Sequence, residues 1–183
     1  MISGRGSNMK ALVAAASQPD FPVRFTHVLS DKAEAPGLAW ASAEGLETGI
    51  VDPKDADDIQ GRLLDSGAEL VCLAGYMRIM PSVVTDAWAG RMINIHPSLL
   101  PKHKGLNAQA KALAAGDAVA GATVHLVEAD VDSGEILEQG CVDILPGDQE
   151  DTLSRRILSV EHEIYPRAVS RYAAAMLAQG EGQ

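Results

Sequence analysis

Short apolar runs alternate with amphipathic stretches along the first hundred or so residues of the chain. Residues 23–30 and 91–96 have the apolar, β-branched character of strands. Residues 55–66 instead place Ile59, Leu63 and Leu64 on one helical face. These patterns predict helices over residues 9–17, 36–44, 55–66, 81–89 and 107–115, and strands over residues 23–30, 48–52, 69–74 and 91–96. Ser7 or Asn8 is expected to cap the first helix. This alternation predicts a parallel sheet with helices on both faces.

The pattern changes after Gly116. Residues 122–129 and 135–145 read as two consecutive strands with no helix between them. A long amphipathic helix follows over about residues 150–177; acidic residues open it, and Pro166 is expected to kink it. We therefore predict one α/β domain over residues 1–183. Its sheet is doubly wound and mostly parallel, with antiparallel C-terminal strands and a long C-terminal helix.

The start of the chain departs from this plan. A doubly wound fold opens with a strand of about five residues before its first turn, but only Met1 and Ile2 precede Ser3. The first strand is thus predicted to be truncated at the N-terminus. Either the true start lies upstream, or the sheet is interrupted at its centre.

Composition and charge narrow the class of protein. A hydrophobic share of 46% and a charged share of 22% in 183 residues are typical of a globular domain. The net charge of −10 argues against a broad nucleic-acid surface, although main-chain N–H groups can still hold a small anion. Cys72 and Cys141 show no zinc-ligand spacing, and no apolar run reaches the ~20 residues of a membrane span. We expect a cytoplasmic protein without a metal, a membrane or a nucleic-acid partner.

The glycine-rich turn over residues 3–8 is a candidate phosphate site. Glycines allow close backbone approach, and the helix that follows offers unpaired N–H groups to an anion. The alternative is a simple tight turn. Met9 stands where a dinucleotide fingerprint needs its third glycine, so a nicotinamide dehydrogenase is only weakly indicated.

Asn94 and His96 form the second candidate. Side chains two apart on a strand point to the same face, so both project together near the strand end that Pro97 marks. An amide can stabilise a developing oxyanion, and an imidazole can move a proton near neutral pH. This pair suits acyl transfer, while a hydrogen-bonded structural histidine is the alternative.

A carboxylate in a loop is the third candidate. Asp132 follows a predicted strand and could orient an imidazole, or it could simply form an Asx turn. His125, in the middle of that strand, is interpreted as a structural histidine whose hydrogen bonds are made within the sheet.

The loop at residues 75–80 is rich in methionine and suits a flat heteroaromatic ligand, although core methionines would look the same. Glu161 and His162 lie in the last helix, either in solvent or near the phosphate end of a cleft.

These segments together resemble a known family. In order along the chain they are ISGRGSN, LAGYMRIM, NIHPSLLP, the TVH strand, DVDSG and EHEIYP. The chain resembles the formyltetrahydrofolate-dependent formyltransferases over nearly its whole length. The segment NIHPSLLP is specific to this group, and the turn SGRGSN is similar to that of the branch acting on glycinamide ribonucleotide.

The resemblance implies the chemistry and a role for each site residue. The formyl group of 10-formyltetrahydrofolate would pass to the amine of glycinamide ribonucleotide, a step of purine biosynthesis, with no metal and with only these small molecules as partners. The catalytic residues would be Asn94, His96 and Asp132. The substrate would be bound by Gly6, Ser7, Asn8, Pro97 and Glu161. The folate would be bound by Met77, Arg78, Ile79, Met80 and Asn94. The protein would be a monomer or a homodimer.

Other functions stay open. Formyltetrahydrofolate deformylase would carry an N-terminal regulatory domain and usually His in place of Pro97. Methionyl-tRNA formyltransferase is not among them, because it would need a basic C-terminal RNA-binding domain and the chain is acidic. A catalytically degenerate folate- or nucleotide-binding module would bind its ligands without turnover.

Overall fold

A computed structural model describes residues 1–180 of the chain. Its helices are α1 (Ser7–Ala16), α2 (Pro36–Ala43), α3 (Ala56–Asp65), α4 (Ser82–Ala87), α5 (Ala108–Ala114) and α6 (Glu150–Gly180). Its strands are β1 (His27–Ser30), β2 (Glu47–Ile50), β3 (Val71–Leu73), β4 (Met92–His96), β5 (Val119–Leu126) and β6 (Ile136–Asp143). The predicted order of elements is confirmed. The single domain over residues 1–183 stays a prediction, and its last three residues lie outside the described part.

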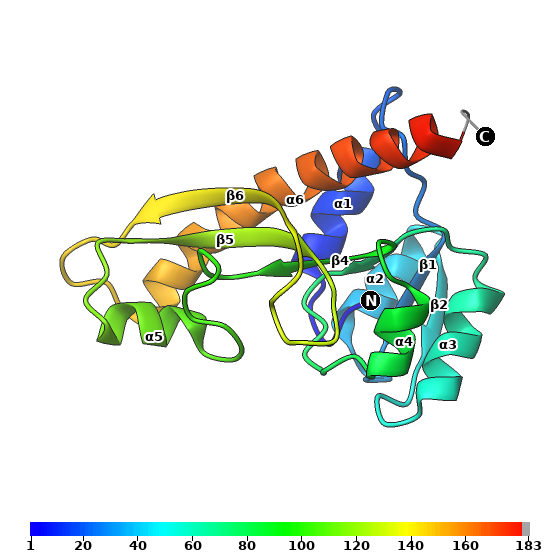
Figure 1. Ribbon diagram of the computed structural model, residues 1–183, viewed down its shortest axis with the longest axis horizontal. Helices are drawn as coiled ribbons and strands as arrows, with labels where there is room; N and C mark the ends of the chain where they lie inside the picture. The colour runs from blue at the N-terminus through cyan, green and yellow to red at the C-terminus, as the bar shows by residue number, and fades with distance from the viewer. Residues whose placement is uncertain (181–183) are drawn as a thin grey trace.

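The strands form a mixed arrangement, as the sequence predicted. β1 pairs with β2 in parallel, and β3 pairs with β4 in parallel. β5 and β6 then add to β4 by antiparallel pairing, which gives a four-stranded sheet in the order β3-β4-β5-β6 beside the two-stranded sheet of β1 and β2. Figure 1 shows β5 and β6 extending to one side, with α6 lying along them and across α1.

Met1–Ser3 joins the two sets of strands. The Ile2 N–H donates to the carbonyl of Leu29 on the β1 side at 2.9 Å. On the β3 side, the Ala74 N–H donates to the carbonyl of Met1 at 2.9 Å, and the Ser3 N–H donates to the carbonyl of Gly75 at 3.0 Å. Three residues therefore lie where a doubly wound sheet has its central strand.

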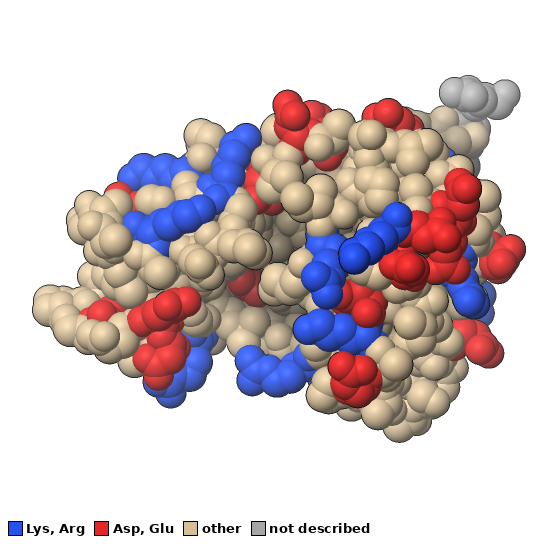
Figure 2. Space-filling model, turned by 90° about the horizontal axis from the view of Figure 1, so that it is seen from below, with Lys and Arg blue, Asp and Glu red and all other residues tan. Residues whose placement is uncertain are grey.

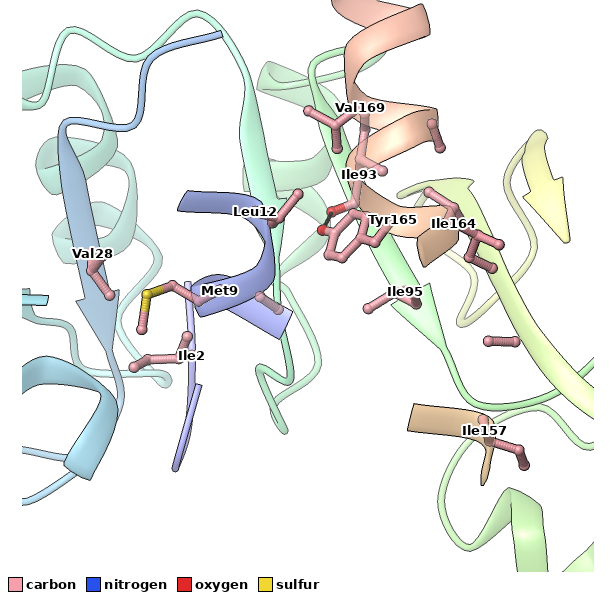
Figure 3. Packing of buried hydrophobic residues seen from close by; sticks show 14 of the residues in the cluster. Ile2, Met9, Leu12, Val28, Ile93, Ile95, Ile157, Ile164, Tyr165 and Val169 are labelled. Carbon is pink, nitrogen blue, oxygen red and sulfur yellow. Dashed lines mark hydrogen bonds between the residues drawn. The ribbon is translucent and has the colours of Figure 1, made fainter. Parts of the chain in front are cut away.

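Two hydrophobic clusters cover the two faces of the sheet. One is built from α1, α2 and α6 and includes Ile2, Leu12 and Val28 (Figure 3). The other is built from α3 and α4 and includes Leu63. The buried Tyr165 hydroxyl of α6 lies 3.0 Å from the carbonyl of β3 residue 73 and 3.1 Å from that of β4 residue 93. This helix therefore holds adjacent strands as well as covering them.

Two local predictions were wrong, each because tertiary contacts outweigh local preference. No side chain caps α1: Gly6, in a left-handed conformation with φ of 67°, is the N-cap residue, and the Asn8 side chain is bonded elsewhere. β1 begins at His27 rather than at residue 23, because its paired partner β2 begins opposite that residue. α6 continues as a helix through the buried Pro166, and the kink at that residue stays a prediction.

Candidate active site

Strand β4 presents Asn94 and His96 on one face, as their spacing predicts. In the antiparallel register with β5, Asn94 lies opposite His125 and His96 lies opposite Thr123. His96 is only 6% exposed. The polar side chains of two neighbouring strands thus gather on the same face, at the end of β4.

The loop after β5 brings Asp132 to these histidines. Its Oδ2 lies 3.3 Å from His96 Nδ1, and its Oδ1 lies 3.5 Å from His125 Nε2. It also accepts a hydrogen bond from the Gly105 N–H at 2.8 Å. Burial works to raise the pKa of Asp132, but these hydrogen bonds and the two imidazoles outweigh it and lower the pKa to about 2. Asp132 is therefore a carboxylate at neutral pH, and Asn94, His96 and Asp132 meet in one cluster.

His96 has an acceptor oxygen at each ring nitrogen. Nδ1 faces Asp132, and Nε2 lies 3.0 Å from the carbonyl oxygen of His103. Two acceptors satisfy an imidazolium, which has two N–H donors. Burial disfavours the imidazolium, because an enclosed cation loses its hydration. This desolvation outweighs the two acceptors and lowers the pKa of His96. Asp132 favours the protonated form of His96, and desolvation by the surrounding protein opposes it.

His125 takes part in this cluster, beyond the sheet role that its sequence context suggested. Its Nδ1 lies 2.7 Å from the carbonyl oxygen of Leu126, which can only accept, so Nδ1 carries the hydrogen. In the neutral ring Nε2 then accepts from the Asn94 side-chain amide, at 3.1 Å, which leaves the second N–H of that amide for another acceptor. In the protonated ring Nε2 instead donates towards Asp132 Oδ1, at 3.5 Å. The usable signal in the sequence was the spacing of Thr123 and His125, which puts them on one face.

Thr123 is a hydrogen-bonding centre that sequence reasoning missed. Its hydroxyl donates to the Ser98 carbonyl at 2.7 Å and accepts from the Leu100 N–H at 3.0 Å. It also accepts from the Gln139 side-chain amide on β6 at 2.8 Å. Thr123 therefore anchors the loop that leaves β4 directly beside His96.

The glycine-rich turn forms the start of α1. Gly6 has a φ of 67°, a backbone conformation that strains any residue with a Cβ, so the sharp turn favours glycine. The first N–H groups of a helix have no partners within the helix, and here they belong to Ser7 and Asn8. The Asn8 side-chain amide donates to buried Glu161 at 2.6 Å, while Asn8 Oδ1 is buried without a partner in the described part of the chain.

Glu161 is the residue for which sequence analysis left two places open, in solvent or near the phosphate end of a cleft. It is buried and accepts a hydrogen bond from Asn8, at the glycine-rich turn. Burial raises its pKa, although the hydrogen bond from Asn8 opposes this. The N-terminal turn and the last helix therefore share one polar contact, and a role for Glu161 in substrate binding stays a prediction.

The methionine-rich loop lies against the glycine-rich turn. The Met77 N–H donates to Ser3 Oγ at 2.8 Å, and Arg78 Nε lies 2.6 Å from a carboxylate oxygen of Asp31. Met77 and Ile79 are exposed and available to a ligand. Met80 is buried in the cluster under α3 and α4, so it packs in the core rather than lining an open site.

The surrounding surface combines a hollow with mixed charge. Figure 2 views the molecule from the side on which the loop after β5 lies in Figure 1, and it shows a hollow with basic side chains around its rim. Pro97, at the end of β4, is half-buried. No helix among residues 1–180 has both the length and the apolar composition that a bilayer crossing requires.

Comparison with known proteins agrees with this geometry. Residues 1–169 match the formyl transferase family. The chain is 38% identical to the phosphoribosylglycinamide formyltransferase of Escherichia coli strain K12, over 99% of this chain and 89% of that protein. It is 41% identical to the trifunctional purine biosynthetic protein adenosine-3 of Drosophila pseudoobscura pseudoobscura, over 97% of this chain but only 14% of that protein. The chain thus spans a small part of the trifunctional relatives that it matches.

Solved structures give the same result. The crystal structure of phosphoribosylglycinamide formyltransferase from Brucella melitensis superposes with a TM-score of 0.89 at 46% sequence identity, covering 94% of this chain and 93% of that one. This identity extends over nearly the full length of both chains and agrees with the family match. The chain belongs to the formyl transferase family and, within it, to the phosphoribosylglycinamide formyltransferases.

Proposed function

We propose that this protein transfers the formyl group of 10-formyltetrahydrofolate to the amine of 5-phosphoribosylglycinamide. The observation that carries the proposal is the meeting of an amide, an imidazole and a carboxylate: Asp132 lies 3.3 Å from His96, and Asn94 lies beside them on β4. Acyl transfer to an amine needs a donor for an oxyanion and a group that moves a proton. These three side chains supply both.

The start of α1 is the proposed phosphate site. Its free N–H groups at Ser7 and Asn8 and the positive end of the helix favour an anion. Gly6 lets the backbone approach closely. The unpartnered Asn8 Oδ1 and the neighbouring Glu161 can accept hydrogen bonds from ribose hydroxyls.

The reaction proceeds by attack of the substrate amine on the formyl carbon. A C–N bond forms, and the carbonyl electron pair moves to oxygen, where the free N–H of Asn94 binds it. Collapse re-forms the carbonyl and breaks the bond to N10 of the folate. The amine gives up one proton, and N10 takes one. His96 carries that proton, directly or through water, and Asp132 stabilises the imidazolium while it does so.

The proposed folate site is the exposed part of the loop after β3. Met77 and Ile79 offer apolar contact to a flat ring, and Arg78 is held beside it by Asp31. Pro97 borders the substrate side at the end of β4. A monomeric or homodimeric state and a cytoplasmic location stay predictions.

The test is an absorbance assay of folate turnover with the purified protein, 10-formyltetrahydrofolate and glycinamide ribonucleotide. Turnover that requires both substrates supports the proposal. Loss of the formyl group without the amine would instead identify a deformylase. Binding of the folate with no turnover in either mixture would identify a degenerate binding module.

A further inference from the structure

His103 contacts the candidate active site through its backbone and a second charged group through its side chain. Its carbonyl oxygen lies 3.0 Å from His96 Nε2. Its ring nitrogen Nε2 lies 2.7 Å from Asp117 Oδ2, and the His103 side chain is only 18% exposed. His103 therefore joins His96 to Asp117 in one chain of hydrogen bonds.

Asp117 is a fixed anchor for the ring of His103. It follows α5, and its N–H donates to the Ala112 carbonyl at 3.2 Å, near the end of that helix. Its second carboxylate oxygen accepts from Lys102 Nζ at 2.9 Å. The hydrogen bonds from His103 and Lys102 lower the pKa of Asp117, so at neutral pH it is a carboxylate and can only accept. The ring of His103 is therefore the donor in its contact with Asp117.

The backbone of His103 adopts a conformation that depends on such an anchor. Its φ is 54°, in the left-handed region that residues with a Cβ enter rarely. Among residues 1–180, the non-glycine residues with a positive φ are His103, Asn107 and Asp132, all in the segments that follow β4 and β5. Residues of this kind persist where surrounding contacts determine them. The contact of the ring with Asp117 supplies that constraint at residue 103, and the backbone conformation there sets where the carbonyl points.

Other contacts of this segment hold the residues on either side of His103. Two side-chain donors bind the flanking carbonyls, at 2.6 and 2.8 Å: Ser98 Oγ binds that of Lys102, and Lys111 Nζ binds that of Lys104. These contacts fix the path of the segment. The contact with Asp117 fixes residue 103 itself, whose carbonyl is the group that meets His96.

The His103 carbonyl acts on His96 together with Asp132. A carbonyl oxygen only accepts, so it holds Nε2 of His96 as a donor, while Asp132 faces Nδ1. Both groups favour the charged ring. His125 and Lys111 also act on the ring by their charge, and both oppose a positive charge on it. The orientation and the proton of His96 thus depend on one peptide group besides the carboxylate.

We propose that His103 is a positioning residue for the formyl transfer: Asp117 holds its ring, and its carbonyl orients the His96 imidazole by accepting from Nε2. The effect on turnover rests on the proposed function, whereas the effect on the ring of His96 can be measured without a substrate. Loss of the contact with Asp117 lets residue 103 leave its left-handed conformation, and the carbonyl then no longer holds Nε2. The glycine-rich turn and the loop after β3 keep their own contacts.

The experiment compares variants at the two ends of this contact. His103→Ala removes the ring, Asp117→Ala removes its acceptor, and a double variant combines them. His103→Gln is the conservative change, because its side-chain amide can still donate to Asp117. Lys102→Ala is the matched control, since it removes the other partner of Asp117 through a side chain that is 64% exposed.

Two measurements are made on each protein. One is kcat and KM for both substrates. The other is the NMR signal of the hydrogen on His96 Nε2, which exchanges slowly with water only while it is hydrogen-bonded. Circular dichroism checks that each variant folds. A purely structural role for His103 would lower stability without freeing this one hydrogen.

We expect His103→Ala and Asp117→Ala to lower kcat about 10-fold and to leave each KM within about 2-fold. Exchange of the Nε2 hydrogen should be at least about 10-fold faster in both. The double variant should be no worse than either single variant, because both changes break the same contact. His103→Gln should restore slow exchange and most of kcat, and Lys102→Ala should match the parent.

Slow exchange of the Nε2 hydrogen in His103→Ala, losses that multiply in the double variant, or equal losses in Lys102→Ala would each overturn the proposal. If the parent does not turn over the two substrates, the proposed function fails, and exchange of the ring hydrogen still decides whether His103 holds His96. If His103→Ala does not fold, Asp117→Ala and His103→Gln provide the same comparison.

Discussion

Replacing Asp132 with Asn removes one charge from the cluster and leaves its shape intact. Asn tolerates the left-handed conformation that Asp132 adopts, with φ of 51°. The side chain is 8% exposed, and its pKa falls from the ordinary 3.8 to about 2. At ~1.4 kcal/mol per pH unit, the folded state gains ~2 kcal/mol from the ionised form. Since the folded pKa is depressed, this stability is present above about pH 4 and is lost as the pH falls towards 2.

The assay is urea unfolding of the parent and the Asp132→Asn protein at pH 7, 5, 4 and 3. The variant should be less stable by ~2 kcal/mol at pH 7, and the difference should shrink as the pH falls below about 5. Asp130→Asn, an exposed change in the same loop, is the matched control and should lie within ~0.5 kcal/mol of the parent. A variant as stable as the parent at pH 7, or a gap at pH 3 as large as the gap at pH 7, would refute the reasoning.

Three further changes test other parts of the structure. His96→Ala should lower kcat at least ~100-fold and leave the circular dichroism spectrum unchanged. The control, His27→Ala at an exposed position, should keep full activity. Near-normal turnover by the His96→Ala protein would exclude His96 from the mechanism. Gly6→Ala should cost ~1–3 kcal/mol in urea unfolding and raise the KM for the phosphorylated substrate, because it strains a positive φ; unchanged values would show that the turn tolerates a side chain. Tyr165→Phe should cost ~1–3 kcal/mol of stability, since buried strand carbonyls lose their donor; an unchanged unfolding midpoint would contradict this.

Features that depend on chain periodicity were predictable. The spacing of two residues put Asn94 and His96 on one face, and the change from alternating elements to paired strands predicted the antiparallel half. In both cases the sequence pattern and the geometry are linked by the strand itself. Asp132 could be predicted only as a carboxylate in the loop after a strand: β5 runs antiparallel to β4 and ends opposite Ile93, so the loop carries Asp132 back to His96.

Features that depend on the path of a loop were not predictable. His103 and Asn107 adopt positive φ angles, 54° and 59°, which residues other than glycine rarely do. That path brings the His103 carbonyl to His96 and the Gly105 N–H to Asp132. The capping prediction at Asn8 failed for a related reason, because its side chain has a better partner in a distant helix.

The contact between the Gly105 amide and Asp132 ties together two segments that leave the sheet at different strands. If the segment after β4 swings outwards, the carboxylate loses a donor and gains water, and the imidazole beside it loses the His103 oxygen at the same moment. The position of this segment therefore sets the hydrogen-bond partners of the carboxylate and of the imidazole together. A ligand that keeps the segment in place preserves both contacts.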